Sequence, residues 1–160
     1  MILCGDLQSE GLPILEKVEL QETTTLTPKF TISYAEEKTN EYTYYKTTSR
    51  LCNITGKNEL PRFSGNIKYE GEFELEEAGK YHLDLGQVGE AAEVFVNGKS
   101  AGCRLISPYS FDISNLLQVG KNELTVSVSN HNGYKKQDSF SQYLLFEPSG
   151  LLGPVMLKKM

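Results

Sequence analysis

The sequence predicts an all-β fold, an antiparallel β-sandwich formed by one domain over residues 1–160. Three observations support this prediction. Apolar and polar residues alternate in several short runs, turn residues separate these runs at short intervals, and no long amphipathic helix is evident. Alternation is what a half-buried strand requires, because successive side chains point to opposite faces. Many short strands with this spacing are typical of a β-sandwich.

Residues 67–75, with the sequence IKYEGEFEL, give the clearest strand. The apolar residues fall on one face and the charged residues on the other. Gly71 interrupts the apolar face, which indicates a β-bulge or a close approach of another group. The same alternation predicts strands at 30–34, 81–85, 92–96 and 123–129, with weaker candidates at 142–146 and 154–158. From this alternation, and from the family resemblance described below, we expect six core residues: Val94, Val96, Phe111, Leu124, Val126 and Val128.

Turn residues define the connections. Asn97 and Gly98 both tolerate positive φ, so they predict a type I′ turn that joins 92–96 and 99–105 into a hairpin. In 111–120, Asp112 or Ser114 is expected to cap a single helical turn that ends at Gly120. The segments 21–30 and 36–50 are rich in Thr, Glu and Lys, and we expect exposed strands or loops there.

Composition excludes several classes of partner. The chain has 16 basic and 21 acidic residues, for a net charge of −5, which argues against a nucleic-acid partner. No apolar run reaches the roughly 18 residues that a membrane helix needs, so no membrane partner is expected. The first residues lack the features of a signal peptide, and we expect an excised piece of a longer protein. The localisation of the chain itself stays open.

No catalytic or metal-binding motif is evident. Cys4, Cys52 and Cys103 are odd in number and form no CxxC pair, so we expect buried free thiols, or one bridged pair with the third thiol free. His82 and His131 are the two imidazoles, and His82 lies on the polar face of a predicted strand. The glutamates form the polar half of alternating strands rather than a recognisable acid–base pair. We therefore predict no catalytic residues, no metal and no cofactor.

A cluster of amide, aromatic and basic residues lies at 130–143, with Arg104 and Tyr109 before it. Planar polar groups can pair with sugar hydroxyls, and an aromatic ring can cover the C–H surface of a pyranose. The same composition also suits a solvent-exposed loop or a contact with a neighbouring domain. The candidate carbohydrate-binding residues are Arg104, Tyr109, Asn130, His131 and Tyr134.

Four consecutive segments carry a family resemblance: FSGNIKYEGEFEL, YHLDLGQVGEAAEVFVNGKSAG, PYSFDISNLLQVGKNELTVSVSN and PSGLLGPVML. They resemble the sugar-binding jelly-roll domain of family-two-type glycoside hydrolases, and the related C-terminal domains of large α-L-rhamnosidase-like enzymes. The resemblance covers about residues 63–157. It implies a galactose-binding-domain-like jelly roll. Leu105-Ile106-Ser107 departs from the family pattern, in which an aromatic or basic residue often precedes the PYxFD segment.

The resemblance also implies a role. The first hypothesis is a non-catalytic C-terminal module of a larger glycoside hydrolase, with the catalytic domain of the parent chain as its partner. Carbohydrate would then bind at a weak or shared site, and the parent enzyme would be periplasmic or extracellular. An autonomous carbohydrate-binding module is the alternative, and a small self-contained hydrolase is a third hypothesis. The sugar and the linkage stay open.

Overall fold

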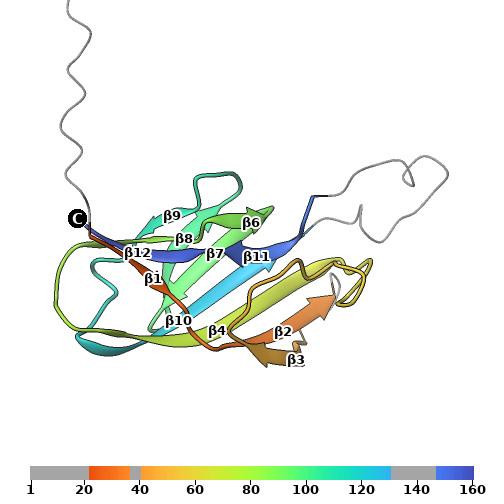
Figure 1. The fold of residues 1–160 in the computed structure, drawn as a ribbon, viewed down its shortest axis with the longest axis horizontal. Coiled ribbons are helices and arrows are strands. Elements are labelled where there is room, and N and C mark those ends of the chain that lie inside the picture. Colours follow the sequence, from red (N-terminus) through yellow and green to blue (C-terminus); the bar gives the residue numbers. More distant parts are fainter. Residues whose placement is uncertain (1–21, 37–40, 131–146) are drawn as a thin grey trace, which may run out of the picture.

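The computed structural model describes residues 22–36, 41–130 and 147–160, and these residues form an antiparallel β-sandwich (Figure 1). A six-stranded sheet has the order β3-β2-β4-β10-β7-β8, and a four-stranded sheet has the order β1-β12-β5-β9. A two-stranded sheet, β11-β6, extends the second layer. The strands are β1 Thr23–Leu26, β2 Phe30–Glu36, β3 Thr43–Thr48, β4 Gly65–Leu75, β5 Tyr81–Asp84, β6 Gln87–Gly89, β7 Ala91–Val96, β8 Lys99–Arg104, β9 Ser110–Asp112, β10 Gly120–Ser129, β11 Gly150–Gly153 and β12 Val155–Lys159.

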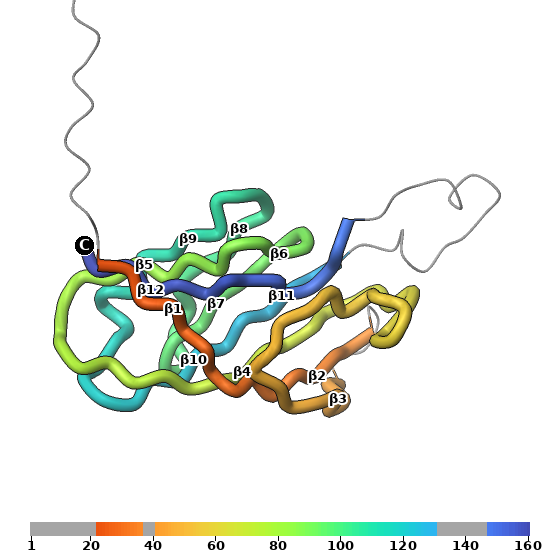
Figure 2. Tube along the Cα trace, viewed as in Figure 1, coloured from red at the N-terminus to blue at the C-terminus, as the bar shows by residue number. Residues whose placement is uncertain are grey.

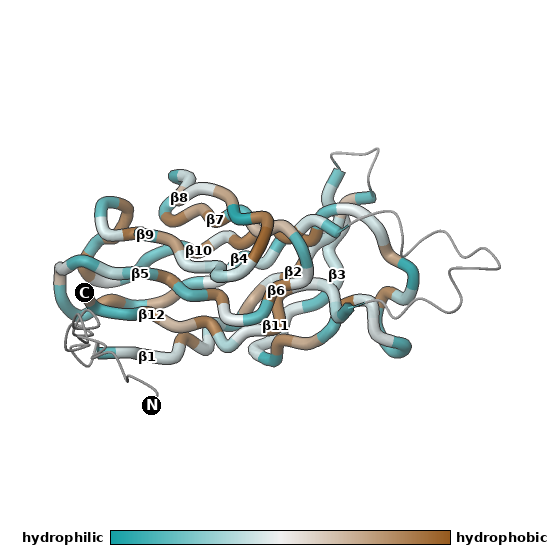
Figure 3. The backbone as a smooth tube through the Cα atoms, turned by 90° about the horizontal axis from the view of Figure 1, so that it is seen from above, coloured by the Kyte–Doolittle hydropathy of each residue, from teal (hydrophilic) through white to brown (hydrophobic). Residues whose placement is uncertain are grey.

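The core lies between the two main sheets, and alternation along the strands fills it. Hydrophilic and hydrophobic stretches alternate along the strands in Figure 3. All six residues that we expected in the core are buried, each with 1% or less of its surface exposed. The apolar face of β4 is buried as predicted, and Leu83 and Leu157 complete the core from the four-stranded sheet.

Gly71 marks a close approach and not a bulge. Its pairing with Leu124 is part of an uninterrupted register between β4 and β10. A Cβ atom at Gly71 would lie 3.0 Å from the ring of Phe30 and 3.2 Å from Pro28. The missing side chain therefore makes room for Phe30, which is one of the largest fully buried side chains.

The hairpin at 97–98 forms as predicted. Val96 pairs with Lys99, and Asn97 and Gly98 have φ angles of 51° and 75°. The helical turn expected within 111–120 is wrong, because a hydrogen-bonded turn forms at 114–116 instead. The Asp112 carboxylate accepts bonds from both the backbone N–H and the hydroxyl of Ser114. The bond from the Ser114 N–H is the cap expected of Asp112. Within residues 111–120, which the structure describes in full, only one turn bond follows it, from the Leu116 N–H to the Ile113 carbonyl, because the Gln118 N–H donates to the Asn122 side chain. β10 then begins at Gly120.

The second layer bends where β5 leads into β6 and β11 leads into β12. Gly86 and Gly153 face each other at this bend and have φ angles of 65° and 75°. A Cβ atom at Gly86 would lie 2.5 Å from the carbonyl oxygen of Gly153. Both strands therefore change direction at one point, and glycine is required there on steric grounds.

The N-terminal strands complete both sheets. β2 pairs with β4 inside the six-stranded sheet, so the predicted strand at 30–34 is confirmed. β1 pairs with β12, and β3 forms the exposed edge beside β2. The strand expected at 142–146 lies outside the described residues. Within the described part of the chain, no helix has the length and hydropathy that a membrane crossing requires.

The two described cysteines are free thiols, as expected, but they are less buried than expected. Cys52 is partly buried. Cys103 is exposed, so the expectation of a buried thiol is wrong there. Its position explains this, because β8 is an edge strand and Cys103 lies near its end. Cys4 lies outside the described residues.

Candidate functional site

One end of the sandwich gathers three of the predicted carbohydrate-binding residues. β8 and β10 both end there, because Arg104 pairs with Ala92 and Ser129 pairs with Ala91. Asn130 follows directly after β10. Tyr109 reaches the same end, since its hydroxyl donates a hydrogen bond to the Glu90 carbonyl just before β7. We call this region, formed by residues 88–91, 104–109 and 130, the loop end.

Arg104 is the exposed cation of the loop end. Its guanidinium carbon lies 5.4 Å from the centre of the Phe111 ring, and its Nη1 donates to the Cys103 carbonyl at 3.1 Å. A guanidinium over an aromatic face is held in place by the ring quadrupole. Because the side chain is exposed, its planar group is accessible to a ligand from solvent.

Asn130 and Tyr109 each have bonds within the chain. The Asn130 oxygen accepts from the Gly65 N–H at 2.8 Å, and its nitrogen donates to the Phe63 carbonyl and the Ser149 hydroxyl. Tyr109 is buried, and burial raises the pKa of its hydroxyl. These contacts give both residues a structural role, and direct contact with sugar stays a prediction. His131 and Tyr134 lie outside the described residues.

Leu105 and Ile106 project from the loop end. Their exposed fractions are 72% and 77%, the highest among the exposed large hydrophobic residues of the described chain. They follow Arg104 directly, in the segment where the sequence departs from the family pattern. The loop end therefore presents an apolar tip beside a cation.

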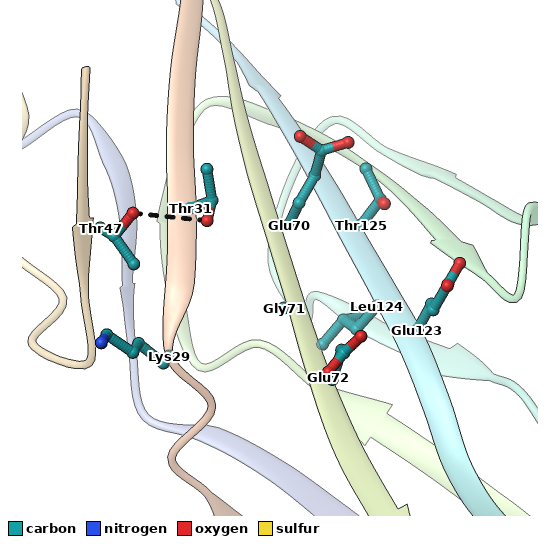
Figure 4. A pocket seen from close by; sticks show the side chains of 9 residues that line it. All are labelled: Lys29, Thr31, Thr47, Glu70, Gly71, Glu72, Glu123, Leu124 and Thr125. Carbon is teal, nitrogen blue, oxygen red and sulfur yellow. Dashed lines mark hydrogen bonds between the residues drawn. The ribbon is translucent and has the colours of Figure 1, made fainter. Parts of the chain in front are cut away.

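A second candidate site lies on the outer face of the six-stranded sheet, where no site was predicted. A shallow depression of about 610 Å³ crosses β3, β2, β4 and β10 (Figure 4). We call it the sheet depression. Its lining residues are Lys29, Thr31, Thr47, Glu70, Gly71, Glu72, Glu123, Leu124 and Thr125. Apart from Gly71 and Leu124, these are polar residues of separate segments in the sequence, and their convergence depends on the strand order.

Two partly buried carboxylates belong to ion pairs. Glu59 accepts bonds from the Lys46 ammonium at 2.5 Å and the Tyr45 hydroxyl at 2.7 Å, and these bonds lower its pKa. Burial opposes ionisation of Asp84, but Lys158 at 2.6 Å and the Gly86 N–H outweigh it and lower the pKa. A general acid needs a raised pKa, so the lowered values argue against that role, and the ion pairs with Lys46 and Lys158 give both carboxylates structural contacts.

Comparison with known proteins places this fold in longer chains. No family model matches the chain. A curated protein of Formosa agariphila, named as a candidate beta-glucuronidase, is 38% identical over 73 residues, which are 42% of this chain and 6% of that protein. The aligned part is thus a small fraction of the curated relative.

Solved structures share the fold at low identity. A rhamnosidase from Novosphingobium sp. PP1Y matches 89% of this chain and 16% of its own, with a TM-score of 0.69 and 22% identity. A GH2 beta-galacturonidase from Eisenbergiella tayi matches 89% of this chain and 25% of its own, with a TM-score of 0.62 and 17% identity. The chain therefore has the fold of a β-sandwich domain that occurs within glycoside hydrolase chains, as the sequence resemblance implied.

Proposed function

We propose that this chain is a non-catalytic β-sandwich module of a larger glycoside hydrolase, where it supports the catalytic domain. The observation that carries this proposal is the small share of each glycoside hydrolase chain that this chain matches. Nearly the whole chain matches 16% of one glycoside hydrolase chain and 25% of another. A domain that makes up such a small part of a longer enzyme fits an accessory role, and its partner is then the catalytic domain of the same chain. The ion pairs of Glu59 and Asp84 are in keeping with a structural role for these carboxylates.

The loop end is the surface that we propose for contact with the catalytic domain or with its substrate. Arg104 supplies a fixed guanidinium, and the exposed side chains of Leu105 and Ile106 supply apolar surface that a neighbouring domain would cover. Any sugar bound there is shared with the catalytic domain. Because each hydrogen bond to a sugar hydroxyl replaces one to water, such a partial site contributes little affinity alone.

Expression of the parent reading frame, with and without this module, tests the proposal. We expect the isolated 160-residue chain to hydrolyse no aryl glycoside, and deletion of the module to lower the melting temperature of the parent enzyme. Turnover by the isolated chain would instead support the small hydrolase. Calorimetry separates the remaining alternative, because micromolar sugar binding that is lost in Arg104→Ala would support an autonomous carbohydrate-binding module.

A further inference from the structure

The sheet depression has a polar row that the strand register explains. Thr47 pairs with Thr31, Thr31 pairs with Glu70, and Glu70 pairs with Thr125, so the four residues lie in line across β3, β2, β4 and β10. At a strand spacing of about 4.8 Å, this row is about 14 Å long. The Thr31 and Thr47 hydroxyls lie 3.4 Å apart, and the side chains of Glu70 and Thr125 extend to the same side of the sheet (Figure 4).

An exposed aromatic ring borders this row. Tyr44 pairs with Ser33, two residues along β2 from Thr31, so it lies on the same outer face. Its hydroxyl lies 3.3 Å from the Thr47 hydroxyl, and 63% of the residue is exposed. An exposed ring beside hydroxyl and carboxylate groups offers a stacking surface for the C–H face of a pyranose together with partners for its hydroxyls.

The charges of the depression favour one class of ligand. Glu72 and Glu123 face each other in register, an arrangement that is unfavourable for two like charges. The Lys121 ammonium forms an ion pair with the Glu72 carboxylate at 2.8 Å, and the Lys68 ammonium forms one with the Glu70 carboxylate at 3.3 Å. Because Lys29, Lys68 and Lys121 balance the three carboxylates, the depression has no excess positive charge to attract an anionic ligand, whereas its carboxylates can accept hydrogen bonds from neutral hydroxyls.

We propose that the sheet depression, with Tyr44 at its border, binds a neutral oligosaccharide. The ring of Tyr44 stacks on one pyranose, and the row from Thr47 to Thr125 bonds the hydroxyls of its neighbours. This site lies on the sheet face and is formed by different residues from the loop end. It goes beyond the proposed function because it needs no catalytic domain.

Titration of the 15N-labelled chain by NMR tests this proposal. The probes are the neutral cellotetraose, xylotetraose and mannotetraose, and the acidic trigalacturonate. We expect at least one neutral probe to shift amide signals of β2, β3, β4 and β10, with a Kd near 1 mM, a free energy of about −4 kcal/mol. Trigalacturonate should bind at least tenfold more weakly. Equal affinity for trigalacturonate, or no shift on these strands with any neutral probe, would overturn the proposal.

Variants locate the site independently. Tyr44→Ala and Glu70→Gln should each weaken binding of the neutral probe at least fivefold, while Tyr44→Phe keeps the stacking ring and should weaken it less than twofold. Val119→Ser removes an exposed apolar side chain outside the depression and should leave binding unchanged. Circular dichroism confirms folding of each variant. A negative result leaves the accessory role intact, because that role is tested in the parent enzyme.

Discussion

Three asparagine side chains hold the turns of the sandwich. The Asn122 oxygen accepts bonds from the side chain of Asn97 and from the Gln118 N–H, each at 2.9 Å. The Asn122 nitrogen donates to the carbonyls of Gln118 and Gly120. Asn130 links Gly65, Phe63 and Ser149 in the same way at the other end of β10. Asn122 and Asn130, near the two ends of the segment GKNELTVSVSN, therefore connect loops, and Asn97 joins the first of these connections.

We expect Asn122→Ala to lower the free energy of unfolding by about 1–3 kcal/mol, because part-buried backbone groups of Gln118 and Gly120 lose their partner. Asn122 is fully buried, so water cannot replace the amide without rearrangement. Urea denaturation measures the change. Lys121→Ala, at the exposed neighbouring position, is the control and should change stability by less than about 0.5 kcal/mol. Equal effects of both substitutions would contradict the role of the amide.

Leu124→Ala tests the register of the core. Leu124 is 1% exposed and contributes to the core between the sheets. Removing a buried leucine side chain usually costs about 2–5 kcal/mol, since it loses transfer free energy and leaves a cavity. Chemical denaturation should show this loss, while Ser127→Ala on the opposite face of β10 stays near the wild-type value. A loss below about 0.5 kcal/mol for Leu124→Ala would show that the core is packed differently.

At the scale of elements, the bend between β5 and β6 depends on Gly86. Gly86→Ala adds a Cβ atom 2.5 Å from a backbone oxygen and also strains a positive φ. We expect a loss of more than about 2 kcal/mol, since the positive φ alone costs about 1–2 kcal/mol. Gly98→Ala is the matched control, because its φ is also positive but no atom lies within 4 Å of the added Cβ. Thermal denaturation should therefore show a smaller loss for Gly98→Ala than for Gly86→Ala.

The ion pair between Asp84 and Lys158 links β5 to β12 and makes stability depend on pH. Burial alone would raise the pKa of Asp84. The bonds from Lys158 and from the Gly86 N–H lower this pKa by a larger amount, so the net shift is downward. A carboxyl with a lowered pKa in the folded state stabilises the fold above its unfolded pKa of about 3.9. This contribution is lost as the pH falls through the folded pKa.

Urea denaturation between pH 6 and pH 2.5 measures this contribution. In Asp84→Asn we expect lower stability at pH 6 and a smaller fall in stability below pH 4 than in the wild type. Glu76→Gln, at an exposed position, controls for the loss of one negative charge. Parallel pH profiles of Asp84→Asn and the wild type would show that the pair does not contribute.

For the whole molecule, the sequence predicted the strands and the core better than the candidate sites. The alternation of apolar residues and the Asn97-Gly98 turn depend only on residues close together in the sequence. The core residues and the hairpin predicted from them were both confirmed. The burial of Asn130 could not be predicted, because its partner Gly65 lies 65 residues away in sequence. The sheet depression depends in the same way on the order β3-β2-β4-β10, which brings Thr47 and Thr125 to one face.

The pairing of β1 with β12 has a mechanical consequence. The Lys159 N–H donates to the Glu22 carbonyl, and β1 lies beside the end of β12 (Figure 2). Tension applied at residues 22 and 160 would therefore pull the two strands apart from one end, beginning at the bond between Lys159 and Glu22 and continuing to the pair of Thr23 and Lys158. Bonds loaded in this unzipping geometry break one at a time, whereas sheared strands resist together. β1 would peel away at low force, while the six-stranded sheet carries no direct load.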